Sequence, residues 1–307
     1  MCRRFLTSLL LLMLIAGSVA PVRGSLRANA TEYEEELTAE EEREAVQVAE
    51  QFVKSFEEKN NPSSLIDELY VKDFDARLRR EPNPFIYLAK IEPEVVEKAS
   101  REELRRLYAA SLNFIYSSSL LYGLALYNRK LRGVEADSDE TPLRELLPPG
   151  VLLVLKDDPL MAALIAEDEE LEREKMGEQK ELPEQGGRAA SEKEEGAGGP
   201  EIRSLERLRG FLYTLERASV LLREYLKTAQ GPRNWKELAN ELRTQGVENE
   251  SGDNCEGLCP RLHVLTEEFF GSPKGTRLVC VDVMAFHMDL IRIDGRLRIL
   301  NVYLSSD

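Results

Sequence analysis

The dipeptide Asp294-Gly295, which lies between two apolar runs near the C-terminus, constrains the fold more than any other feature of the sequence. Asp-Gly between apolar runs is the strongest short-range signal for a β-hairpin with a two-residue turn. We therefore expect two antiparallel strands, with a further strand around residues 263–270 before them and a turn at residues 271–275. The first hairpin strand is either long or broken near Asp282. The expected cross-strand pairs are Ile293 with Arg296, Leu290 with Ile299, Met288 with Asn301 and Phe286 with Tyr303.

Helical patterns dominate the rest of the chain. Thr38 with Glu41, and Ser100 with Glu103, have the spacing of capping boxes, which begin helices. The first opens a helix with one apolar stripe, and the second opens a long helix that runs toward Leu131. The stripe consists of Ala45, Val48, Ala49, Phe52, Val53 and Phe56. The sequence thus predicts an α+β fold that is predominantly helical, with a C-terminal antiparallel β-sheet or hairpin.

The long predicted helix is unusually apolar between Leu107 and Tyr127. A membrane span and a buried core helix are both compatible with this pattern. Polar side chains interrupt the apolar stretch, namely Ser111, Asn113, Ser117, Ser118 and Ser119. We therefore favour a core helix, and we expect no membrane contact after removal of the N-terminal signal.

Residues 176–200 divide the chain into two parts. Glu, Lys, Gln and Gly dominate this segment, which cannot bury enough apolar area to offset its chain entropy. It is predicted to be a disordered linker between a helical part, residues 31–175, and a second part, residues 201–307. The two parts form either separate units or one domain.

Residues 1–30 have the pattern of a secretory signal. Arg3 and Arg4 precede an apolar run that is too short for a comfortable membrane span. Cleavage is expected after Ala30, within the sequence Ala28-Asn29-Ala30. The alternatives are a cut near Ala20 or Gly24 and an uncleaved N-terminal anchor. The sequence therefore predicts an exported protein, either secreted or periplasmic.

The chain is strongly acidic, with a formal net charge of −15. Removing residues 1–30, which hold four arginines and no acid, makes it −19. Nucleic-acid binding requires clustered Lys and Arg, so this charge argues against nucleic acid as a partner and against an anionic membrane surface. The partner is expected to be a small molecule or a protein, and the composition leaves the oligomeric state open.

Three cysteines remain after the signal. Cys255 and Cys259 are close enough for a disulfide, which we expect, with free thiols as the alternative. Zinc is disfavoured there because CxxxC with one nearby histidine, His263, is a poor metal signature. Cys280 lies in an apolar run and is predicted to be a buried free thiol. No metal site and no cofactor are predicted, since the sequence has no P-loop, dinucleotide-binding turn or HExxH motif.

The candidate catalytic residues are His287 and Asp289, which are two residues apart on a predicted strand and so share one face. Partial burial beside Leu300 and Val302 would tune the imidazole for acid–base chemistry. The simpler interpretation, which alternation favours, makes this the solvent face, opposite a core face carrying Phe286.

Two segments resemble the NTF2-like (SnoaL-like) superfamily: residues 45–74 and residues 281–303. The resemblance implies a curved sheet wrapped against helices into a cone, here with a long helical insertion, around an apolar pocket. We expect Phe286, Met288 and Tyr303 to line that pocket. The family includes isomerases, dehydratases and non-catalytic binding modules.

Three functions follow from these patterns. We favour a non-catalytic module that binds a small molecule or a protein, because the chain holds only two histidines and no convergent catalytic set. The alternative is a SnoaL-like lyase or isomerase with His287 and Asp289 as acid and base. The third is an envelope-associated structural protein that uses its acidic linker as a tether.

Overall fold

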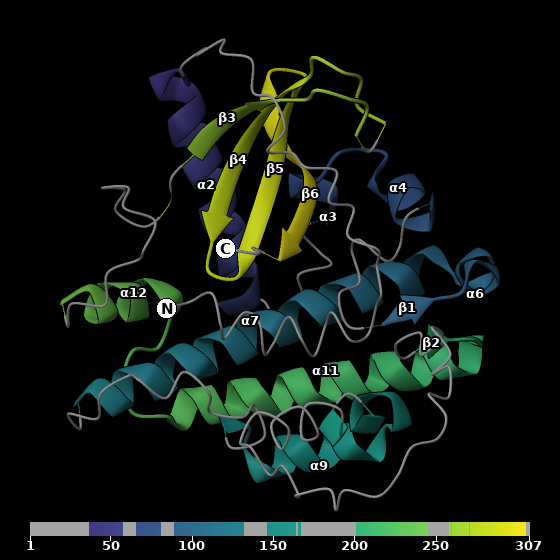
Figure 1. The fold of residues 1–307 in the computed structure, drawn as a ribbon, viewed down its shortest axis with the longest axis vertical. Helices are drawn as coiled ribbons and strands as arrows, with labels where there is room; N and C mark the ends of the chain where they lie inside the picture. Colours follow the sequence, from purple (N-terminus) through teal and green to yellow (C-terminus); the bar gives the residue numbers. More distant parts are fainter. Residues whose placement is uncertain are drawn as a thin grey trace, which may run out of the picture.

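Helices and one C-terminal antiparallel sheet make up the protein (Figure 1), which confirms the predicted α+β class. The structure is a computed structural model that describes residues 37–57, 66–80, 89–131, 146–163, 165–166, 201–244, 258, 260–269 and 271–304. The predicted signal at 1–30, the predicted linker at 176–200, and both Cys255 and Cys259 lie outside this part, so these predictions stay predictions.

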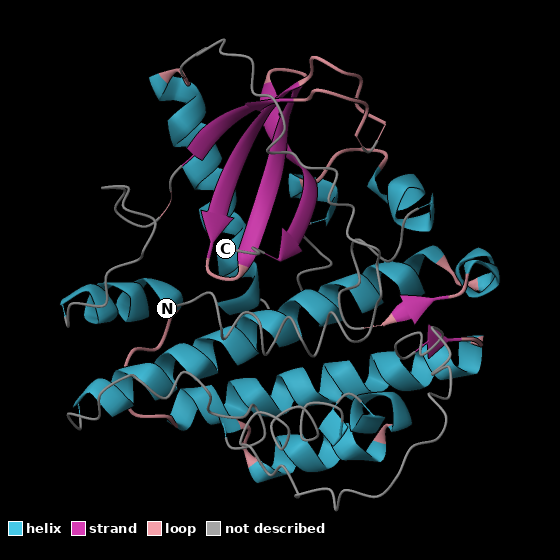
Figure 2. Ribbon diagram, in the orientation of Figure 1, coloured by secondary structure: helices cyan, strands magenta, loops and turns pink. Residues whose placement is uncertain are grey.

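The sheet contains four strands in the order β3-β4-β5-β6, each antiparallel to the next (labelled in Figure 1, and magenta in Figure 2). Their bounds are β3 Pro260–Val264, β4 Arg277–Val283, β5 Phe286–Ile293 and β6 Arg296–Leu304. The predicted first hairpin strand is broken into β4 and β5 by a turn at Met284 and Ala285. At the β5–β6 turn, Asp294 and Gly295 both have positive φ, 52° and 78°, as a two-residue turn of this type requires. This confirms the predicted hairpin.

The predicted hairpin register is correct near the turn and wrong beyond Leu290. Ile293 pairs with Arg296 and Leu290 with Ile299, but a β-bulge follows, at which Leu300 has no partner on β5. The pairs beyond the bulge are Asp289 with Asn301, Met288 with Val302, His287 with Tyr303 and Phe286 with Leu304. Because a bulge moves every later side chain to the other face, the apolar Val302 joins the core and the polar Asn301 leaves it.

Helix α2 (Ala39–Glu57) covers the core face of the sheet (Figure 1). Its predicted capping box is confirmed, with Thr38 N–H donating to Glu41 and Glu41 N–H donating to Thr38 Oγ1. The predicted apolar stripe is buried along its whole length. The rings of Phe52 and Phe56 pack against Phe286 of β5, with centroids 5.6 Å and 6.1 Å away. The stripe and the sheet therefore form one hydrophobic core.

A layer of longer helices lies below the sheet in this view (Figure 1). The two longest, α7 (Arg101–Leu131) and α11 (Leu205–Thr228), lie side by side, with α9 (Pro149–Asp157) on α11 and α12 (Trp235–Thr244) on α7. The short strand β1 (Lys90–Ile91) pairs in parallel with β2 (Glu201–Ile202). The hydrophobic core therefore runs through residues on both sides of the predicted linker.

Helix α7 is a core helix. Among the described residues, Arg101–Arg129 is the one helical segment long and apolar enough to cross a membrane, and 83% of its apolar window is buried inside the protein. Its capping box is confirmed, with Ser100 N–H donating to Glu103 at 2.8 Å. Burial of this kind is the ordinary property of a central helix in a protein core.

The short helices were the least predictable part. The elements concerned are α3 (Ile66–Leu69), α4 (Phe74–Arg80) and α6 (Pro93–Lys98). Strand β1 lies just before α6, which begins at Pro93. Arg79 of α4 donates to the carbonyl oxygens of Val96 and Ala99, which satisfies the C-terminal end of α6 through a tertiary contact that no local pattern shows.

Candidate functional site

Strands β4 and β5 bring four titratable side chains together on one face of the sheet. Cys280 pairs with Asp289 and Asp282 pairs with His287 across the β4–β5 ladder, so all four point from the same face. The bulge on β6 adds Asn301 and Tyr303 opposite Asp289 and His287. The sequence predicted His287 and Asp289 as neighbours, but it gave no signal for the other members.

His287 is enclosed by two carboxylates. Its Nδ1 lies 2.6 Å from Oδ1 of Asp282, and its Nε2 lies 3.5 Å from Oδ1 of Asp289. The ring of Tyr303 covers one side, with ring centroids 4.6 Å apart. The His287 side chain keeps 22% of its exposure, so the cluster remains within reach of solvent on this side.

Asp289 and Cys280 are more deeply buried than His287. Asp289 is 3% exposed, and the Cys280 thiol donates to its Oδ1 at 3.3 Å. The interpretation of His287 and Asp289 as ordinary solvent residues is therefore wrong for Asp289, which is buried between its cross-strand partners Cys280 and Asn301. Cys280 is free and buried, as predicted.

The pKa values in the cluster follow from burial and from these contacts. Burial opposes the charged imidazolium, but hydrogen bonds to Asp282 and Asp289 outweigh it and raise the pKa of His287 to about 12. Burial raises the pKa of the Cys280 thiol to about 11. Burial also works against the charge on Asp282, yet the hydrogen bond to His287 holds the pKa of that carboxyl below its usual value. Near neutral pH, the imidazole is therefore charged and the thiol keeps its proton.

The same cluster holds a potential set of metal ligands. One ligand atom each from Cys280, His287 and Asp289 lies within 4.8 Å of the other two. The chemistry open to this face is therefore recognition of a ligand by buried charge, or coordination of a cation.

The three predicted pocket residues do not share a face. Phe286 and Met288 are fully buried on the opposite side of β5, in the core against α2, whereas Tyr303 contacts His287. An apolar pocket lined by all three stays a prediction. His263, the partner that a zinc site at Cys255 and Cys259 would have used, lies on β3 opposite Leu278.

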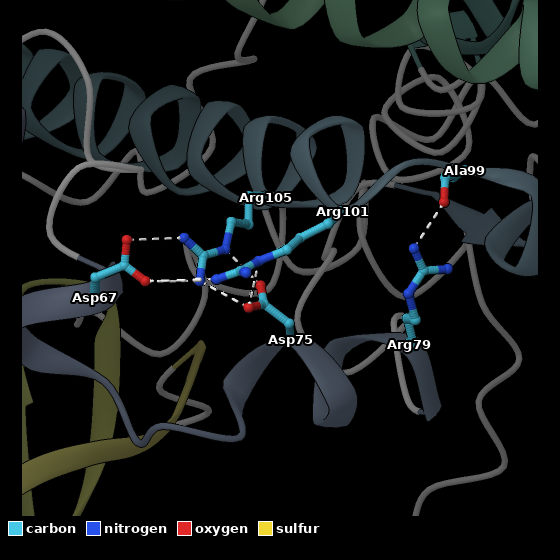
Figure 3. Close-up of polar contacts among 6 residues, drawn as sticks. All are labelled: Asp67, Asp75, Arg79, Ala99, Arg101 and Arg105. Atoms are coloured by element: carbon cyan, nitrogen blue, oxygen red, sulfur yellow. Dashed lines mark hydrogen bonds and ion pairs between the residues drawn. The ribbon is translucent and has the colours of Figure 1, made fainter.

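A second polar cluster joins three helices and serves the fold (Figure 3). Arg105 of α7 binds both carboxylate oxygens of Asp75 on α4 and both of Asp67 on α3. Arg101 reaches the same two acids, with its Nε 2.7 Å from Asp75. The Arg105 side chain is only 11% exposed, and its guanidinium binds both carboxylates. The cluster therefore anchors α3 and α4 to α7.

Comparison with known proteins gives no relative for this chain: no family model, no curated protein and no solved structure matches it. The geometry of the β4–β5–β6 face therefore carries the functional argument.

Proposed function

We propose that this chain is a non-catalytic binding module and that it takes its ligand at the face of the sheet formed by Cys280, Asp282, His287 and Asp289. The observation that carries the proposal is the double contact of His287. Both ring nitrogens face carboxylate oxygens of the protein itself, at 2.6 Å and 3.5 Å. A histidine held in this way presents a fixed, partly exposed charge.

A lyase or an isomerase needs a group that exchanges a proton with the substrate. A general base must bring a free nitrogen or oxygen within hydrogen-bonding distance of the proton it takes. Here Asp282 occupies Nδ1 and Asp289 lies against Nε2. Asp289 itself is buried and accepts from Cys280. The contacts within the protein thus favour binding over the acid–base alternative.

Two further parts of the proposal rest on the sequence. The pattern of residues 1–30 supports action outside the cytoplasm. The resemblance to the NTF2-like (SnoaL-like) superfamily supports a binding cone, and the packing of α2 across the sheet is compatible with it. Recovery of the mature chain from the extracytoplasmic fraction, with an intact mass that starts after Ala30, tests the first part.

Native mass spectrometry of the purified full chain tests the binding function. We expect a retained small molecule that is released on denaturation and that the Asp289→Asn variant has lost. Asp294→Asn is the matched control, because Asp294 lies at an exposed turn and pairs with Lys72 there. Retention of the ligand by both variants would place binding elsewhere. Chemical conversion of the released molecule, dependent on His287, would favour the lyase or isomerase instead.

A further inference from the structure

The geometry points to a site for a divalent transition-metal ion, with Zn²⁺ as the best fit, formed by Sγ of Cys280, Nε2 of His287 and Oδ1 of Asp289. The inference deepens the proposed function, on which it rests, because it names the class of ligand taken at the same face. Each of the three side chains supplies one ligand atom, and the three atoms lie within 4.8 Å of one another.

Two of the distances between the ligand atoms fit a tetrahedral ion. Zinc lies about 2.3 Å from a thiolate and about 2.0–2.1 Å from nitrogen or oxygen ligands, so tetrahedral ligands stand roughly 3.3–3.6 Å apart. Oδ1 of Asp289 lies 3.3 Å from Sγ of Cys280 and 3.5 Å from Nε2 of His287. Two of the three edges of the ligand triangle therefore already have the required length.

Asp282 orients the histidine for this role. Metal-bound histidines almost always donate their other ring N–H to a carboxylate, a carbonyl or water, which fixes the tautomer and the ring direction. Asp282 Oδ1 lies 2.6 Å from Nδ1, so Nε2 is turned toward Cys280 and Asp289. The outer partner that a metal site requires is already in place.

Asn301 gives a second, independent indication. The residue is 2% exposed, and its Oδ1 has no hydrogen-bond partner. It pairs with Asp289 across β5 and β6, so the two side chains share a face and stand a few ångströms apart. A buried oxygen without a donor costs free energy, which a cation or a metal-bound water beside Asp289 would offset.

The composition of the set selects the metal. A thiolate, an imidazole and one carboxylate suit zinc better than magnesium or calcium, which prefer oxygen ligands alone. Binding replaces the proton on Nε2 of His287 and the proton on Sγ of Cys280, and both protons pass to the solvent. Three protein ligands leave the fourth position to water or to a bound small molecule.

Cobalt(II) substitution tests the inference on the full chain. The background variant carries Cys2→Ser, Cys255→Ser and Cys259→Ser, so that Cys280 is its single thiol. After treatment with a chelator, one equivalent of Co²⁺ is expected to give a near-ultraviolet thiolate-to-cobalt band that Zn²⁺ abolishes. Adding Cys280→Ser should remove the band, and Asp282→Asn should weaken Zn²⁺ binding by about 10–100-fold. Asp294→Asn is the matched control and should leave affinity unchanged.

A background variant with the wild-type circular-dichroism spectrum and no such band would overturn the metal inference, as would a band that survives Cys280→Ser. The test on the background variant needs no substitution in the cluster, so its outcome is valid even if a cluster variant fails to fold. If the protein binds no metal but retains an organic ligand that depends on Asp289, the metal site is wrong and the proposed binding function stands. Turnover by a protein that does bind zinc would overturn the non-catalytic function and leave the metal site standing.

Discussion

Nδ1 of His287 lies 2.6 Å from Oδ1 of Asp282, its direct partner across the β4–β5 ladder. The contact is charge-assisted and only partly exposed, with 22% of the His287 side chain and 34% of the Asp282 side chain accessible. Hydrogen bonds between charged groups contribute more to stability than neutral ones do. This pair therefore both holds the imidazole in place and contributes to the stability of the sheet.

Replacing Asp282 with Asn should lower the free energy of unfolding by about 1 kcal/mol, because an amide oxygen still accepts from Nδ1 but the charge on the acceptor is gone. Urea unfolding of chelator-treated protein measures the change. The matched control is Asp294→Asn, whose pair with Lys72 is exposed on both sides and should contribute less than the Asp282 pair does. Equal losses of unfolding free energy in the two variants would show that burial of the Asp282–His287 pair does not increase its contribution to stability.

Arg105 and Arg101 offer a second matched comparison, since both contact Asp67 and Asp75 (Figure 3). Arg105 is 11% exposed and Arg101 is 61% exposed. Arg105→Ala should cost about 2–3 kcal/mol in unfolding free energy, because it leaves the partly buried Asp75 short of its main partner. Arg101→Ala should cost less than about 1 kcal/mol. A reversed order would mean that the exposed arginine anchors α3 and α4.

Acid stability should depend on Glu103 at the start of α7. The backbone N–H of Ser100, together with Arg209 and the Ser100 hydroxyl, lowers the pKa of Glu103 from 4.5 to about 2. A carboxyl with a lowered folded-state pKa stabilises the fold above its unfolded pKa, and this contribution is lost as the pH falls from about 4.5 toward 2.

Glu103→Gln should therefore flatten the fall of unfolding free energy between pH 4.5 and pH 2, as measured by urea unfolding at a series of pH values. Glu102→Gln, an exposed change in the same helical turn, is the control and should keep the wild-type slope. An unchanged slope in Glu103→Gln would contradict the assigned role of the capping box and of Arg209.

The sequence was sufficient for the starts of α2 and α7 and for the β5–β6 turn, whose signals are local. Capping boxes located the starts of α2 and α7, and the apolar stripe of α2 identified its buried face. Asp294-Gly295 fixed the turn of the hairpin. Each of these signals depends on residues within about four positions of one another, which is the range over which backbone hydrogen bonds and side-chain caps act.

Only half of the candidate site was predictable, because its other residues are positioned by contacts without a local sequence signal. The turn at Met284 and Ala285 lacks an Asn-Gly or Asp-Gly signature, so the sequence left open whether the strand breaks near Asp282. It did not place Asp282 and Cys280 beside His287 and Asp289. The bulge at Leu300 was also hidden, because Ile299 and Leu300 are both apolar and both fully buried. The alternation of polar and apolar residues along one strand does not reveal a register that tertiary packing sets.

Two glycines with open space around them should respond to alanine in opposite ways. A Cβ would meet nothing within 4 Å at either Gly295 or Gly150. Gly295 has a φ of 78°, which strains an alanine, so Gly295→Ala should cost about 1 kcal/mol. Gly150 lies in the first turn of α9, where alanine has the higher helix propensity, so Gly150→Ala should stabilise by about 0.5 kcal/mol. Thermal and urea unfolding of the two variants measure both shifts, and a gain in stability from Gly295→Ala would contradict the positive φ at the hairpin turn.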